Sequence, residues 1–398
     1  MAKKKAARKS AKKKTASKKA ARKKVATKKK SAPKKKSRKK GARKKTVRSG
    51  ALSDTDLMKK LQPLLEKPDS QKQIIELLAP LDEAQRKALA PHCISWLQIQ
   101  KRTDFIEDPP GNFRRWNPLN GPIEVAAFCV ASLTNIKKLG RRSLPSGDAV
   151  VEILKVRKPD WADQIAEILL EGSYYWGSWR TVREMVKQKL CPKPKNTRYY
   201  TGMITGLCGW RWGGEDRQTA LAGLRADPSL LQDEVWRLFE YEGDGENTLA
   251  NVDRWEATSW SGALATLSKE GKLSRPRLLA AALGALELGF NHYRAKWFFT
   301  FIDLLEPTDR ELKKHADTML GLVGSPTPNV AAWAFEKASA MYERGLVKDA
   351  SQLGAAASPL LMAKQKGTVQ KTLKFLGQLA ENSPESAGEI CVLAADAM

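Results

Sequence analysis

The sequence predicts an all-α protein in which a stack of amphipathic helices follows a disordered basic segment. Apolar residues recur at helical spacing, as at Leu279, Leu283, Leu286 and Phe290. Ser or Thr, followed by Pro or Glu, marks the start of many of these helices. The first 50 residues contain no acidic and no aromatic residue. Their dense positive charge, with almost no apolar groups to collapse it, predicts disorder.

The net charge of +28 is divided very unequally along the 398 residues. Residues 1–50, here called the basic segment, hold 21 Lys and 5 Arg. The remainder, here called the helical body, holds 45 basic and 43 acidic residues, so it is nearly neutral. The high overall pI therefore describes the basic segment and says nothing about the ligand of the helical body.

The basic segment is expected to bind nucleic acid without reading its sequence. Duplex DNA carries one negative charge per roughly 1.7 Å of its axis, and lysine binds phosphate mainly as a point charge. The segment lacks the Asn and Gln side chains that read adenine. We favour DNA over RNA as the partner. The residues expected to contact it are Lys3, Lys4, Lys5, Arg8, Lys12, Lys13, Lys14, Arg22, Lys28, Lys29, Lys30, Lys34, Lys35, Lys36, Arg38, Arg43, Lys44 and Lys45.

The Lys, Ala, Pro and Ser composition of this segment, with Ser31-Ala-Pro-Lys-Lys-Lys36 inside it, resembles two kinds of basic tail. These are the C-terminal tail of linker histones and the histone-like extensions of bacterial nucleoid proteins. The resemblance is compositional, and it implies sequence-independent DNA compaction. We therefore expect a cytoplasmic, nucleoid-associated protein, or a nuclear one in a eukaryote. A localisation signal, an RNA-binding arm and a solubilising tail remain alternatives.

Residues 51–215 predict an N-terminal helical region. Helices are expected within 52–100, where Ser53 and Asp56 form a capping pattern, and then at 123–139, 146–156 and 160–170. Pro63 and Pro91 are expected to kink or divide the helices that contain them. Residues 101–121 form a long connection in which proline and glycine disfavour regular structure.

Aromatic and cationic residues alternate near the end of this region. Four Trp and four Tyr fall between Tyr174 and Trp212, and several Arg lie among them. This pattern is typical of a surface for single-stranded nucleic acid, and equally of a Trp-rich core bordered by Arg side chains. We favour the core interpretation, both here and for the loop. The candidate surface residues are Arg114, Arg115, Trp116, Trp176, Trp179, Arg180, Trp210, Arg211 and Trp212.

Residues 216–398 predict a C-terminal helical-repeat region. Asp227 with Pro228 predicts one helix start, Thr308 with Glu311 a capping box, and the acidic residues 240–247 a turn. Helix pairs recur at roughly 35–45 residues, the range of HEAT-like or armadillo-like solenoids. The part from Arg294 onward resembles an uncharacterised bacterial family of HEAT-like helical proteins, by Phe301–Thr308 and Lys364–Lys371. The resemblance implies the fold and transfers no catalytic residue.

No pattern in the sequence predicts catalysis, a cofactor or a metal. The five Cys lack ligand spacing, the three His lie far apart, and no apolar run approaches the length that spans a bilayer. We expect a non-enzymatic DNA-associated protein whose helical body binds a protein partner. One alternative is a HEAT-like DNA-modifying enzyme of the glycosylase type. Another is an adaptor whose basic segment serves only localisation or RNA binding.

Overall fold

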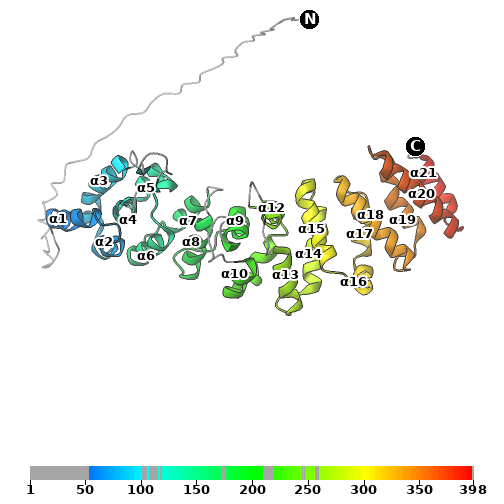
Figure 1. Ribbon diagram of the computed structural model, residues 1–398, viewed down its shortest axis with the longest axis horizontal. Helices are drawn as coiled ribbons and strands as arrows, with labels where there is room; N and C mark the ends of the chain where they lie inside the picture. Colours follow the sequence, from blue (N-terminus) through cyan, green and yellow to red (C-terminus); the bar gives the residue numbers. More distant parts are fainter. Residues whose placement is uncertain are drawn as a thin grey trace, which may run out of the picture. The chain divides into compact units, whose positions relative to one another are not determined.

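A computed structural model of the protein describes residues 53–396, except 101–104, 107–114, 117–118, 172–175, 209–218, 244, 246 and 256–259 (Figure 1). Residues Leu52–Met398 form one compact unit. The described residues are almost entirely helical, and helices that follow one another in the sequence pack side by side. The expected all-α helical-repeat fold is confirmed. No helix in the described part of the chain is long and apolar enough to cross a membrane.

The first part of the helical body contains nine α-helices and a 3-10 turn among the described residues. They are α1 (Asp54–Leu65), α2 (Gln71–Leu78), α3 (Glu83–Gln100), α4 (Asn120–Val130), α5 (Leu133–Leu139), η2 (Arg141–Ser143), α6 (Gly147–Arg157), α7 (Ala162–Leu170), α8 (Trp176–Lys187) and α9 (Thr197–Cys208). The long connection contributes β1 (Phe105–Ile106) and β2 (Arg115–Trp116), which pair antiparallel. Helices α4 and α6 lie at the centre of this part, because α1, α2 and α3 all pack against α4.

The helix start expected at Ser53 is present, whereas the breaks expected at two prolines are not. The Ser53 hydroxyl accepts a hydrogen bond from the backbone N–H of Asp56 at 3.2 Å, as the capping pattern predicts. Helix α1 runs through Pro63 and α3 runs through Pro91, so neither proline divides its helix. Both prolines are exposed, and water can satisfy the carbonyl groups that they leave unpaired.

One expected helix is two. The chain is extended at Ala131, and the Ser132 side chain then starts α5 with a reciprocal capping box to Asn135. The expected helix over 123–139 is therefore α4 followed by α5, because a good N-cap residue lies inside an otherwise continuous apolar pattern.

The second part continues with twelve α-helices and two 3-10 turns within the described residues. They are α10 (Ala220–Ala226), η3 (Pro228–Leu231), α11 (Glu234–Arg237), α12 (Leu249–Trp255), α13 (Trp260–Lys269), α14 (Arg275–Glu287), α15 (His292–Leu304), α16 (Asp309–Lys314), α17 (Ala316–Val323), α18 (Pro328–Glu343), α19 (Ala350–Ala357), η4 (Ser358–Met362), α20 (Lys366–Asn382) and α21 (Ala387–Asp396). The pairs α14–α15, α17–α18 and α19–α20 repeat, and α14, α17 and α19 also pack in series. Helices α9 and α10, on either side of residue 215, pack against each other.

The expected helix start at Asp227 is a 3-10 turn instead. The Asp227 carboxylate does not cap the turn, because the Arg183 guanidinium binds it in a bidentate pair at 2.8 and 3.1 Å. Arg183 also binds Glu234 at 3.1 Å. Burial acts to raise the pKa of Asp227, but hydrogen bonds from Arg183 and Ser229 hold that pKa below its ordinary value. This buried network joins α8 to the turn and to α11.

A tryptophan and an aspartate form the same contact between helices in two consecutive steps of the repeat. The indole Nε1 of Trp297 on α15 donates to Asp253 on α12 at 2.7 Å. One step later, the indole of Trp333 on α18 donates to Asp303 on α15 at 3.2 Å. Each bond satisfies a nearly buried indole N–H and sets the height at which one helix lies against the next.

The Thr308–Glu311 capping box is confirmed, and it also anchors the preceding helix pair. Glu311 binds the Arg275 guanidinium at 2.7 Å, while Arg275 donates at 2.7 Å to the carbonyl of Leu305, at the end of α15. The hydrogen bond from Arg275 is the main cause that lowers the pKa of Glu311 from 4.5 to about 2.

The Glu311→Gln variant should be less stable than the parent at neutral pH. Because the folded pKa of Glu311 is lowered, its contribution is complete above pH 4.5 and is lost as the pH falls towards 2. The difference in unfolding free energy between parent and variant should therefore shrink across this range. Urea titrations at several pH values measure it, with the exposed Glu336→Gln as the control. A pH-independent difference would contradict the assignment.

Candidate functional site: a cleft between helices α6 and α8

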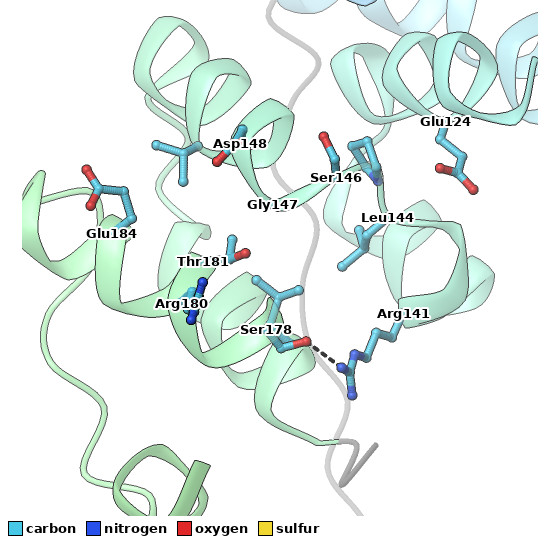
Figure 2. Close-up of a pocket in the computed structure, with 13 residues that line it drawn as sticks. Glu124, Arg141, Leu144, Ser146, Gly147, Asp148, Ser178, Arg180, Thr181 and Glu184 are labelled. Atoms are coloured by element: carbon cyan, nitrogen blue, oxygen red, sulfur yellow. Dashed lines mark hydrogen bonds between the residues drawn. The ribbon is translucent and has the colours of Figure 1, made fainter. Parts of the chain in front are cut away.

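A cleft of about 700 Å³ opens where the start of α6 faces α8, and Figure 2 shows the residues that line it. Helices α4, α6 and α8 and the turn η2 each contribute charged side chains. The charged and hydroxyl side chains that line it are Glu124, Arg141, Ser146, Asp148, Ser178, Arg180, Thr181 and Glu184. None of the described residues that line the cleft is a His or a Cys.

Two glycines place the walls of the cleft. Gly140 has φ +72°, in the left-handed region that favours glycine, and there the chain turns from α5 into η2. Gly147, the first residue of α6, lies so close to α8 that an added Cβ would be 2.0 Å from the Thr181 Oγ1. Only a residue without a side chain allows this approach, so Gly147 sets the width of the cleft at this end.

The charges in the cleft are of both signs. Arg141 donates a hydrogen bond to the Ser178 hydroxyl at one end, and Figure 2 places Asp148 and Glu184 towards the other. Glu184 accepts a hydrogen bond from Gln188 at 2.5 Å, so it is held along α8. A cleft with this mixture of donors and acceptors suits a polar or dipolar ligand better than a polyanion such as nucleic acid.

Arg180, a predicted site residue, lines the cleft but has a structural task as well. Its Nε donates at 2.5 Å to the carbonyl oxygen of Gly206, and its Nη2 lies 3.5 Å from that of Leu207. Cationic side chains stabilise helix C-termini through such carbonyl groups. Arg180 therefore joins α8 to the end of α9.

Trp179 belongs to the core, as the favoured interpretation predicts, and its place among the candidate surface residues is wrong. Its side chain is 3% exposed. The ring lies against Gly202 and Gly206 of α9, where a Cβ on Gly206 would be 2.7 Å from the Trp179 Cε3. The two glycines form a slot for the indole. Gly206 lies inside α9, four residues after Gly202, and this spacing of two glycines on one helix face is the local signal of the close contact.

The other predicted site residues give less information. Arg115 and Trp116 form β2 and Trp176 begins α8, where the structure describes the backbone only. Arg114, Trp210, Arg211 and Trp212 lie outside the described residues, as does the whole basic segment. In the part of the chain that is described, no group of three or more His, Cys, Asp or Glu side chains could hold a metal ion.

The Gly147→Ala variant should be destabilised by about 1–3 kcal/mol, because overpacking of a buried contact costs this much. Removal of the opposing hydroxyl by Thr181→Ala should restore part of the loss. A double-mutant cycle on the unfolding free energy measures the coupling. The double variant should be more stable than the sum of the two single effects predicts, and strictly additive effects would show that Gly147 does not set the spacing.

Trp179→Ala should lower the unfolding free energy by about 3–5 kcal/mol, the cost of truncating a large core residue. Trp161, which is half-buried beside the Arg157 guanidinium, provides the control, and its alanine variant should lose clearly less. Chemical denaturation of both variants makes the comparison. Equal losses would place Trp179 outside the core.

Comparison with known proteins places most of the helical body in one sequence family. The sequence model of a family described as "Domain of unknown function (DUF6493)" matches residues 55–367. The match begins far before Arg294, from which the sequence resembles a helical family, and includes all the described residues around the cleft. Comparisons with the curated proteins and with the solved structures gave no match. Because the family match spans more than half of the 398 residues, the chain belongs to the DUF6493 family.

Proposed function

We propose that the protein is a non-enzymatic, DNA-associated scaffold. The basic segment binds duplex DNA without sequence preference, and the helical body binds a protein partner. The observation that carries the proposal is the separation of charge along the chain. Residues 1–50 hold 26 of the 71 basic residues and no acidic residue, whereas the helical body is nearly neutral.

The composition of the basic segment supports DNA as its partner. If all its cations engaged at once, they would match the phosphates of about 13 base pairs. Binding of this kind gains free energy from released counterions, so its affinity falls steeply as salt increases. Because the interaction needs charge and not a fixed conformation, the order of residues within the segment should matter little.

The helical body supports a partner other than DNA. Stacked helix pairs expose extended surfaces that suit proteins. The cleft between α6 and α8 presents Glu124, Asp148 and Glu184 beside its two arginines, a mixture that disfavours a phosphate backbone. Burial of Trp179 also removes one of the four tryptophans on which a glycosylase-type enzyme would depend for base stacking. On this proposal the basic segment holds the protein at the nucleoid, or in the nucleus of a eukaryote, and the helical body recruits a partner protein there.

The experiment compares three full-length proteins for binding to a fluorescent DNA duplex over a range of salt concentrations. They are the parent, a variant with the order of residues 1–50 scrambled, and a variant with every Lys and Arg of residues 1–50 replaced by Gln. The scrambled variant should bind like the parent. The Gln variant should lose most of the affinity and most of its salt dependence.

Two outcomes would contradict the proposal. If the Gln variant bound DNA as tightly as the parent, the helical body and not the basic segment would hold DNA. If an RNA duplex of equal length competed better than the DNA duplex, RNA would be the preferred partner.

A further inference from the structure

A second cleft lies over α12, α13 and α15, and we propose that it binds an acidic segment with aliphatic side chains from a partner protein. This inference rests on the proposed scaffold function, because it names the chemistry of the partner. The cleft measures about 630 Å³ and is separate from the cleft at α6. Its lining combines apolar and aromatic groups with the exposed cations Arg254 and Lys296.

Helix α15 supplies one wall as a continuous stripe. Tyr293, Lys296, Thr300 and Leu304 follow one another at helical spacing, and all four line the cleft. Tyr293 is 38% exposed and Leu304 is 47% exposed, so both ends of the stripe offer apolar surface to a ligand. An apolar group docked here would lie against Leu304 and the edge of Tyr293.

The floor of the cleft is fixed in place. The Asp253 carboxylate accepts hydrogen bonds from the backbone N–H groups of Trp260 at 2.6 Å and Ser261 at 3.0 Å, and from the Trp297 indole at 2.7 Å. The Tyr293 hydroxyl donates to the carbonyl oxygen of Ala250 at 3.1 Å, which holds its ring across the opening. A preorganised site of this kind loses little side-chain entropy when a partner binds.

A ligand that enters the cleft would meet a net positive charge. Asp253 is compensated by its three internal donors, whereas Lys296 is exposed and makes no ion pair with the residues that the structure describes. An incoming carboxylate would find a cation at the rim and no uncompensated acid on the floor. Charge complementarity therefore favours an acidic partner.

The next step of the repeat shows the same arrangement, but there the cation is paired with the carboxylate. Asp303 on α15 accepts the Trp333 indole, as Asp253 accepts that of Trp297, but it also binds Lys337 at 2.9 Å. Lys337 follows Trp333 by one helical turn, and the residue one turn after Trp297 is the buried Phe301. Lys337 is thus paired within the protein, whereas Lys296 is available to a carboxylate from a partner.

A protein segment fits better than single-stranded nucleic acid. Base stacking requires exposed aromatic faces, but Trp297 is 8% exposed and Phe301 only 1% exposed. Among the described residues that line the cleft, only Tyr293 offers part of an aromatic ring at the surface. Leu304 and the other apolar residues that line the cleft instead suit Leu-type side chains, with Asp or Glu placed to meet Lys296.

The test uses the full chain and a fluorescein-labelled amphipathic peptide of Glu and Leu, with a Lys–Leu peptide of the same pattern as its counterpart. The variants are Leu304→Ser, Lys296→Glu and, as the matched control, Leu288→Ser, an exposed leucine outside the cleft. All of them keep the basic segment, so its attraction for acidic peptides is common to every measurement.

Leu304→Ser and Lys296→Glu should each weaken binding of the Glu–Leu peptide about tenfold, while Leu288→Ser binds like the parent. Lys296→Glu should at the same time gain affinity for the Lys–Leu peptide. Equal affinity of the parent and Leu304→Ser for the Glu–Leu peptide would overturn the proposal. A single-stranded oligonucleotide that lost affinity at the same two variants, without any change for the peptide, would assign the cleft to nucleic acid instead.

This experiment separates the cleft from the DNA-binding proposal. The three substitutions leave residues 1–50 untouched, so duplex DNA should bind every variant with the affinity of the parent. Failure of the peptide result with intact DNA binding would therefore reject the cleft alone.

Discussion

The centre of the helical body depends on one buried cation. The Arg183 guanidinium, only 11% exposed as a side chain, binds Asp227 and Glu234 and lies 3.4 Å from the Tyr199 hydroxyl. These partners come from a turn, from α11 and from α9, so a single side chain on α8 fixes three following elements. Lys193 adds an ion pair with Asp233 at 2.6 Å at the edge of the same network. Removal of one partner would leave an uncompensated charge in the interior, which is far more costly than the loss of a surface pair.

Close approach of helices is the second constraint, and it acts on two faces of α8, which lines the first cleft. Gly147 brings α6 against Thr181, and Gly206 makes room on α9 for Trp179. Both contacts involve α8, which is therefore fixed from two directions. The cleft keeps its shape because the helices beside it cannot slide without a collision between Gly147 and Thr181 or between Gly206 and Trp179. The polar lining is thus presented by a rigid frame, as a binding site requires.

The sequence predicts the helical fold well because local signals determine it. Ser53 and Thr308 start helices through their own hydroxyl groups, as their capping patterns predict, and apolar spacing identifies the buried faces. The same local patterns mislead where a side chain binds a partner that is distant in the sequence. Asp227 has the pattern of a helix cap, but Arg183, distant in the sequence, takes its carboxylate. Composition identifies the basic segment, since its expected partner is recognised by charge alone.

The candidate sites follow this division. Arg180 was predicted from its aromatic neighbours, and it does line the first cleft, but its hydrogen bonds to α9 could not be predicted from spacing. Trp179 was ambiguous, because a buried indole and a stacking platform have the same local pattern. The second cleft was not predicted at all. Its lining comes from three helices, and the donors to Asp253 come from α13 and α15. Such convergence appears only when the helices are packed.

The hydrogen bonds from Trp297 to Asp253 and from Trp333 to Asp303 have a mechanical consequence. Each bond joins one step of the stack to its neighbour and to no other. In an array of this kind, a pulling force is borne in turn by each junction, and the weakest junction separates first. The helical body would then yield in steps and not all at once, and the indole–carboxylate bonds would break one after another.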